Sequence, residues 1–224
     1  MYFFVGIDFS INYPAIVIKN YQEKKLDYLA FFRNNKLSKK HLKIIEILNE
    51  LEEYHSFNLP ERNIIDKTTD YSNKEKIKSF DCNKISQFIP LVLSLYLNEV
   101  KSKNINIAIE GFSFASRGSA NNELIGYQYV LRNEFIKRGW NFEVFAPMTI
   151  KKTAGKGNFN KNEMIEAFLN NTTNDEELTK SNLIKKIKEN EKFFKTKTKW
   201  QKPVEDIIDA YWVMRHNELL QQKL

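Results

Sequence analysis

Cysteine, glycine and proline are scarce in this 224-residue sequence, which contains 1, 7 and 5 of them. The single thiol, Cys82, excludes an internal disulfide framework, and three histidines are too few to complete a Cys/His zinc cage with it (His41, His55, His216). Any bound metal is therefore expected to be held by oxygen ligands. A hydrophobic content of 42%, with 13% aromatic residues, suffices for a sizeable core.

Long apolar runs are also absent. No stretch approaches the roughly 18 residues that a membrane span needs, and residues 1–11 carry neither a charged leader nor a small-residue cleavage site. We therefore expect a soluble, cytoplasmic protein without a membrane partner, in a bacterium or a virus-infected host cell. The length favours one domain over residues 1–224, with insertions at about 59–79 and 171–202.

Positive charge is concentrated in one part of the chain. The net charge is +7, and residues 137–202 contain fifteen Lys and Arg against eight Asp and Glu, so the whole excess lies in this stretch. Clustered positive charge is typical of a nucleic-acid-binding surface, because neutralising phosphates releases counterions. Lys-rich surfaces also serve solubility. Lysine outnumbers arginine 29 to 6, a composition typical of AT-rich genomes such as those of many viruses and bacteriophages.

Hydrophobic patterning predicts an α/β fold with a mixed five-stranded sheet. Apolar runs at 2–8, 14–19 and 26–32 predict three consecutive antiparallel strands, and runs at 105–110 and 140–146 predict two more. Helical spacing predicts helices beginning near Ser38, over about 83–101 with a kink or boundary at Pro90, over 120–137 and over 204–221. Residues 59–79 are expected to be irregular. Residues 170–200 are expected to hold one amphipathic helix and then a flexible basic segment, 195–199.

Four acids occupy positions at which a metal site can be built. Asp8 and Glu110 each end a hydrophobic strand, and the carboxyl ends of parallel strands form the ligand crevice of open α/β sheets. Asp206 and Asp209 are three residues apart on the closing helix and project from one face of it. Singly, each acid has an ordinary explanation as a turn residue, a surface charge or a helix N-terminal acid. Together they suit two Mg²⁺ ions roughly 3.5–4 Å apart, an arrangement that hydrolyses phosphodiesters.

In the order of its motifs, the sequence resembles the RuvC-type Holliday-junction resolvases, which have the ribonuclease H-like fold. Residues 5–8 (VGID) are similar to the family's first strand and first catalytic acid, and residues 107–110 (IAIE) to its second. Residues 147–161 are similar to a strand exit, a glycine-bearing loop and a helix start that carry two functional lysines. Residues 205–210 (EDIIDA) are similar to the closing helix with its paired acids.

This resemblance implies a fold, an activity and a set of site residues. The implied protein is a ribonuclease H-like, Mg²⁺-dependent endonuclease of DNA recombination and repair, in which Mn²⁺ substitutes for Mg²⁺ and no small-molecule cofactor takes part. The implied substrate is the four-way DNA junction, which a homodimer resolves by paired symmetric nicks. The implied metal ligands and catalytic acids are Asp8, Glu110, Asp206 and Asp209.

Further residues are implicated in contacts to DNA. By the same match Lys161 and Lys151 are the two functional lysines, Lys161 acting in catalysis, and the expected backbone contacts are Lys152, Lys156 and Arg117. An aromatic residue after the family's second acid stacks on an unpaired base at the crossover. Phe112 and Phe114 bracket the matching position, and both are equally explained as core residues.

Other functions are compatible with parts of the pattern. Residues 9–12 (FSIN) replace the small turn that follows the first acid in typical members, so a nuclease for branched or flap DNA or for RNA–DNA hybrids is an alternative. A non-catalytic junction-binding protein is disfavoured because all four acids are present. Sugar kinases and actin-like ATPases also begin with a strand ending in an acid, but they need a glycine-bearing phosphate loop next. Here no glycine lies between Gly6 and Gly111.

Overall fold

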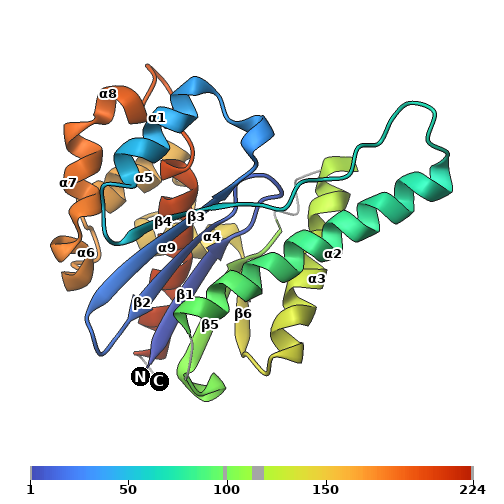
Figure 1. Cartoon of the computed structure of the whole chain (residues 1–224). Coiled ribbons are helices and arrows are strands. Elements are labelled where there is room, and N and C mark those ends of the chain that lie inside the picture. Colours follow the sequence, from blue (N-terminus) through green and yellow to red (C-terminus); the bar gives the residue numbers. More distant parts are fainter. Residues whose placement is uncertain (1, 98–99, 113–118, 223–224) are drawn as a thin grey trace.

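A six-stranded sheet, in the order β4-β3-β2-β1-β5-β6, forms the centre of the computed structural model, which describes residues 2–97, 100–112 and 119–222 (Figure 1). The strands are β1 (Phe3–Asp8), β2 (Ala15–Asn20), β3 (Lys25–Phe32), β4 (Tyr54–Asn58), β5 (Ile105–Glu110) and β6 (Phe142–Phe145). β1, β2 and β3 pair antiparallel, whereas the pairs β3/β4, β1/β5 and β5/β6 are parallel. Every strand except β2 therefore runs in one direction and ends at the same edge of the sheet.

This sheet confirms the predicted α/β fold class, a mixed sheet in which three antiparallel strands are followed by parallel ones. It contains one strand more than the sequence predicts, because residues 54–58 leave the helical pattern and pair with β3 as an edge strand. The preceding helix, α1 (Lys39–Leu48), is capped by Ser38, whose side chain accepts a hydrogen bond from the His41 amide. After α1 the chain turns tightly, with the Leu51 amide donating to the Leu48 carbonyl, and enters β4.

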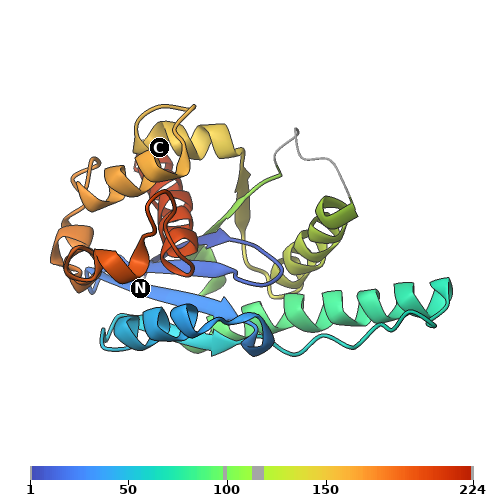
Figure 2. The same cartoon turned by 90° about the horizontal axis from the view of Figure 1, so that it is seen from above.

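Helices cover both faces of the sheet (Figures 1 and 2). α2 (Tyr71–Tyr96) and α3 (Ser119–Lys137) lie on one face, where they share a core with alternate strand residues such as Val5 and Ile7. The other face packs against α1, α4 (Pro147–Ala154), α5 (Lys161–Leu169) and α9 (Val204–Gln221), in a core that includes Phe4. Within the described part of the chain, no helix combines the length and the apolarity needed to cross a membrane.

Helix α2 differs from its predicted extent. It begins at Tyr71, inside the stretch predicted to be irregular, and ends at Tyr96 with Pro90 in its interior. Asp70 caps it by accepting a hydrogen bond from the Asn73 amide at 3.0 Å. The first turns carry mostly polar side chains that are exposed or half-buried, so no hydrophobic periodicity marks them in the sequence.

Residues 147–200 also hold more helix than expected. Residues 147–154, which the resemblance matches to a strand exit, form α4 because Pro147 occupies the first helical position. The predicted amphipathic helix is confirmed as α7 (Asn182–Glu189), but it is flanked by α6 (Glu176–Lys180) and α8 (Glu191–Phe194). Residues 195–199 form a turn closed by a bridge between Lys195 and Trp200. Short 3₁₀ helices occupy Asn34–Lys36 and Ser102–Asn104.

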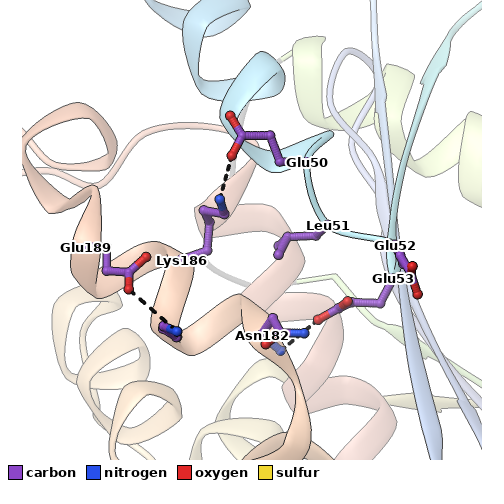
Figure 3. A pocket seen from close by; sticks show the side chains of 8 residues that line it. Glu50, Leu51, Glu52, Glu53, Asn182, Lys186 and Glu189 are labelled. Carbon is purple, nitrogen blue, oxygen red and sulfur yellow. Dashed lines mark hydrogen bonds and ion pairs between the residues drawn. The ribbon is translucent and has the colours of Figure 1, made fainter.

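Helix α7 docks onto the turn before β4 (Figure 3). The Lys186 ammonium lies 2.6 Å from the Glu50 carboxylate, and the Asn182 amide donates to Glu53 at 2.8 Å. The hollow lined by these residues lies where β4 begins, at the edge of the sheet opposite Asp8. These contacts therefore anchor α7 beside β4, remote from the acids at the strand ends.

Candidate metal centre

Two of the predicted site acids end neighbouring parallel strands. β1 and β5 are paired in a register that sets Ile7 opposite Ile109, so the following residues, Asp8 and Glu110, come side by side. The strands are almost wholly buried, whereas both acids are only half-buried. The hydrophobic runs therefore fix the backbone while their last residues reach the edge of the sheet.

Helix α9 brings the second pair of acids to the same edge. It packs so closely on β1 that a Cβ added at Gly6 would lie 2.2 Å from both the Ala210 carbonyl oxygen and the Met214 amide nitrogen. Only glycine permits this approach. Asp206 and Asp209 lie on the first turns of α9, just before this contact. The glycine two residues before Asp8 thus controls the distance between the two pairs of acids.

The four carboxylates act on one another electrostatically. Burial raises the pKa of Asp8 well above its usual value, and the negative charges of Asp209, Asp206 and Glu110 raise it further. Burial, followed by the charge of Asp209, raises the pKa of Glu110 to about 7. Burial also raises the pKa of Asp206, to about 6, and that of Asp209. The four predicted acids therefore lie within electrostatic reach of one another, and their repulsion favours any cation that comes between them.

Two lysines neutralise the acids of α9. Lys161, the first residue of α5, places its Nζ 2.8 Å from Asp209 Oδ2 and 2.6 Å from Glu205 Oε1. Burial alone lowers the pKa of Lys161, but these acids outweigh it and raise the pKa above its usual value. Lys202 Nζ lies 2.6 Å from Asp206 Oδ1. Sequence reasoning counted Lys202 only as part of the basic stretch, although it lies four residues before Asp206.

The donor chemistry of this centre fits a divalent cation. All four acids offer oxygen, which suits Mg²⁺ or Mn²⁺. The Asp206 side chain is 3% exposed, and its buried Oδ2 has no hydrogen-bond partner among the described residues, which leaves an acceptor that a cation satisfies. Across residues 2–97, 100–112 and 119–222, no three His, Cys, Asp or Glu side chains stand close enough to hold an ion as they are. The lysines occupy the α9 carboxylates in this arrangement, so an ion has to displace their ammonium groups.

The other predicted lysines differ in their burial and in their effect on the acids. Lys151, in the last turn of α4, is half-buried, and its charge counteracts the raised pKa of Glu110. Lys152 and Lys156 are exposed. The structure therefore places Lys151 beside the centre and the other two on the surface next to it.

Of the predicted aromatic and arginine contacts, the structure describes Phe112 alone. Its ring is half-buried, lies 6.3 Å from the Tyr129 ring between centroids, and has the Arg132 guanidinium 5.2 Å from its own centroid. A flat cation above an aromatic ring is a surface on which a base can stack. Phe114 and Arg117 lie outside the described residues.

Among known proteins, similarity to this chain was found in solved structures. No protein-family model and no curated protein matches the sequence. Among solved structures, the chain is similar to Thermus thermophilus RuvC, with 11% identity and a TM-score of 0.48 over 98% of this chain and 96% of that chain. It is also similar to T. thermophilus RuvC in complex with Holliday junction substrate, with 10% identity and a TM-score of 0.49 over the same shares.

Proposed function

We propose that this protein is a divalent-metal-dependent endonuclease that cleaves four-way DNA junctions. The observation that carries the proposal is that Asp8, Glu110, Asp206 and Asp209 lie at one edge of the sheet within electrostatic reach of one another, with raised pKa values. Buried like charges destabilise a fold, and such clusters are characteristic of functional sites. Without an ion, the buried negative charges lower the stability of the folded protein. A cation bound between them offsets this loss.

Each group in this centre has a chemical task. Divalent ions held by carboxylates supply an activated water and offset charge on the phosphate under attack. Asp8 and Glu110 provide ligands from rigid strands, and the acids of α9 provide ligands from the first turns of a helix that is locked onto β1. Lys161, which reaches the same carboxylates, is placed to neutralise charge developing on the phosphate.

Binding of the DNA backbone is assigned to the basic surface beside the acids. Lys151, Lys152 and Lys156 follow one another along α4 and the loop after it, within the stretch that holds all of the net positive charge. The whole chain forms one nuclease domain with two insertions. A homodimer with two-fold symmetry brings two centres to opposing strands of a junction and produces paired nicks.

Cleavage of a synthetic four-way junction, with and without Mg²⁺, tests the proposal. Asp8→Asn is expected to abolish cleavage while junction binding survives, because a ligand is lost but the basic surface is intact. Glu143→Gln, which neutralises an exposed acid on β6, is the matched control and is expected to cleave like the wild type. Full activity of Asp8→Asn, or cleavage in excess EDTA, would contradict the proposal.

The substrate needs its own comparison. Residues 9–12 (FSIN) directly follow the first acid and depart from the small turn of the resembled family, so flap DNA and RNA–DNA hybrids are the second candidate. The same preparation assayed on junctions, forks, hybrids and plain duplex separates the two. A preference for four-way junctions is the expected result.

A further inference from the structure

A basic pocket lies beside the carboxylates, at the same edge of the sheet. Its volume is about 390 Å³, and its polar lining consists of Asn12, Arg33, Asn35, Lys36, Arg62 and Asn63. Two isoleucines complete the lining, so no acidic residue contributes to it. β3 and β4 run in the same direction as β1. The segments that follow them, which form the pocket, therefore emerge at the edge where Asp8 ends β1.

Arg33 is a buried cation that pairs with no carboxylate in the described part of the chain. It is 4% exposed, and its two terminal nitrogens donate to the carbonyl oxygens of Pro60 and Ile11 at 3.1 and 3.3 Å. Its Nε is buried and finds no hydrogen-bond partner among residues 2–97, 100–112 and 119–222. Burial, followed by the positive charge of Arg62, lowers the pKa of Arg33. Burying a charge without a partner is costly, so an anion in this pocket stabilises the folded protein.

The opposite wall of the pocket is held in place by a buried acid. Asp81 on α2 is 1% exposed and accepts hydrogen bonds from Arg62 Nε at 3.4 Å, and from the amide and the side chain of Asn63 at 3.1 and 2.9 Å. Arg62 also pairs with Glu123 on α3. These acids offset the charge of Arg62. The positive charges left for a ligand are those of Arg33 and the exposed Lys36.

A row of contacts connects this pocket to the candidate metal centre. Lys202, the partner of Asp206, holds its Nζ 5.1 Å from the centroid of the Tyr13 ring. The Tyr13 hydroxyl donates to the Lys36 carbonyl oxygen at 2.8 Å. One nucleic-acid strand lying across the carboxylates can therefore continue over Tyr13 to the pocket.

We propose that this pocket binds a backbone phosphate of the DNA substrate, on the strand that crosses the carboxylates. The inference rests on the proposed nuclease function and adds a substrate contact from the β3 and β4 side, outside the lysine-rich stretch. Guanidinium and ammonium groups supply charge-assisted hydrogen bonds to phosphate oxygens, and the side chains of Asn12 and Asn35 supply neutral donors. These donors fit a backbone phosphate, and binding of a phosphate requires no recognition of a base.

Binding assays without metal test the pocket separately from cleavage. Lys36→Gln removes an exposed charge from the pocket and leaves the core untouched. Its affinity for a fluorescent four-way junction in EDTA is expected to fall about 5–10-fold, and the salt dependence of binding to lose roughly one phosphate contact. Arg33→Gln, checked for folding by its melting curve, is expected to lose at least as much. Lys103→Gln, which removes an exposed charge before β5 at the opposite edge, is expected to bind like the wild type.

Neutral methylphosphonate linkages placed one at a time in the junction identify the phosphate. One position is expected to weaken binding of the wild type and to have no further effect on Lys36→Gln. If Lys36→Gln bound the junction with the affinity and salt dependence of the wild type, the proposed phosphate site would be refuted, even if the protein cleaves junctions. If the variants showed the expected binding losses but the protein never cleaved DNA, the phosphate site would be supported and the nuclease function refuted.

Discussion

The Nζ of Lys202 lies 2.6 Å from Asp206 Oδ1, while no group in the part of the chain that the structure describes donates a hydrogen bond to the buried Oδ2 of the same carboxylate. One oxygen is neutralised by a side chain that reaches water, and the other is left as an unsatisfied acceptor. Because the lysine is 33% exposed, it can turn into solvent when a stronger cation arrives. The carboxylate is thus available to a metal ion although it is almost wholly buried.

Replacing Glu110 by glutamine is expected to stabilise the metal-free protein at high pH. The folded pKa of about 7 exceeds the ordinary 4.5, so the stability that protonation contributes is complete below about pH 4.5 and is lost as the pH rises through 7. Glu110→Gln avoids this loss. Its Tm in EDTA is expected to exceed that of the wild type by roughly 2–5 °C near pH 8, and to equal it near pH 4.5.

Glu143→Gln serves as the control for this measurement, since the Glu143 carboxylate is exposed to solvent on β6. It is expected to melt with the wild type at both pH values. A Tm difference for Glu110→Gln that is the same at both pH values would indicate a packing effect and contradict the electrostatic explanation.

Mg²⁺ or Mn²⁺ is expected to raise the Tm of the wild-type protein. At an ion concentration about 100 times the Kd, the stabilisation is about 2.7 kcal/mol, or roughly 5–10 °C for a chain of this size. The shift should shrink near pH 6, because Glu110 must lose a proton before it can bind an ion. Differential scanning fluorimetry across ion concentrations measures it. Asp206→Asn is expected to lose the shift, and a full shift in that variant would exclude Asp206 as a ligand.

The elements that carry the acids could be predicted from the sequence. The sequence predicts the strand at 105–110 and the helix at 204–221 with the observed bounds, because the strand is a hydrophobic run that ends at an acid and the helix begins directly after a proline. The approach of the two pairs of acids could be expected from the order of strands and helix. Its closeness depends on Gly6, whose contact with Ala210 joins residues far apart in the chain.

Other features left no local signal. β4 is a half-buried edge strand without clear alternation, and the first turns of α2 are polar, so neither shows a regular hydrophobic pattern. Arg33 directly follows β3, and nothing in the neighbouring sequence indicates that it is buried. The packing of the loops after β1 and β4 buries it. Contacts between distant segments, rather than propensities, created these features.

The contact between β1 and α9 is expected to tolerate no side chain at position 6. Gly6→Ala puts a methyl group 2.2 Å from two backbone atoms of α9, so the helix has to move away from the sheet. We expect a loss of roughly 1–3 kcal/mol or more, measured by chemical denaturation, together with loss of cleavage because the two pairs of acids separate. Gly126→Ala is the control. Nothing lies within 4 Å of a Cβ at that position in α3, and alanine there is expected to stabilise the helix by about 0.5–1 kcal/mol.

The role of Lys161 can be separated from that of an ordinary ion pair. Lys161→Gln is expected to slow junction cleavage about 100-fold, because a positive charge near the developing phosphate charge is lost. The same substitution is expected to tighten Mg²⁺ binding, since the ammonium group that competes for Asp209 is gone. Lys180→Gln, which removes an exposed lysine charge from α6, is expected to alter neither quantity.

Thermal shifts titrated with Mg²⁺, together with single-turnover cleavage, measure both effects of Lys161→Gln. A purely structural ion pair predicts a lower Tm with an unchanged midpoint of the Mg²⁺ titration. Slow cleavage combined with a lower midpoint of the Mg²⁺ titration is expected only if Lys161 shares the site with both the ion and the phosphate. Since Lys161 contacts Asp209 and Glu205 at once, its removal leaves two acids unpaired, and their repulsion is what draws the ion more strongly.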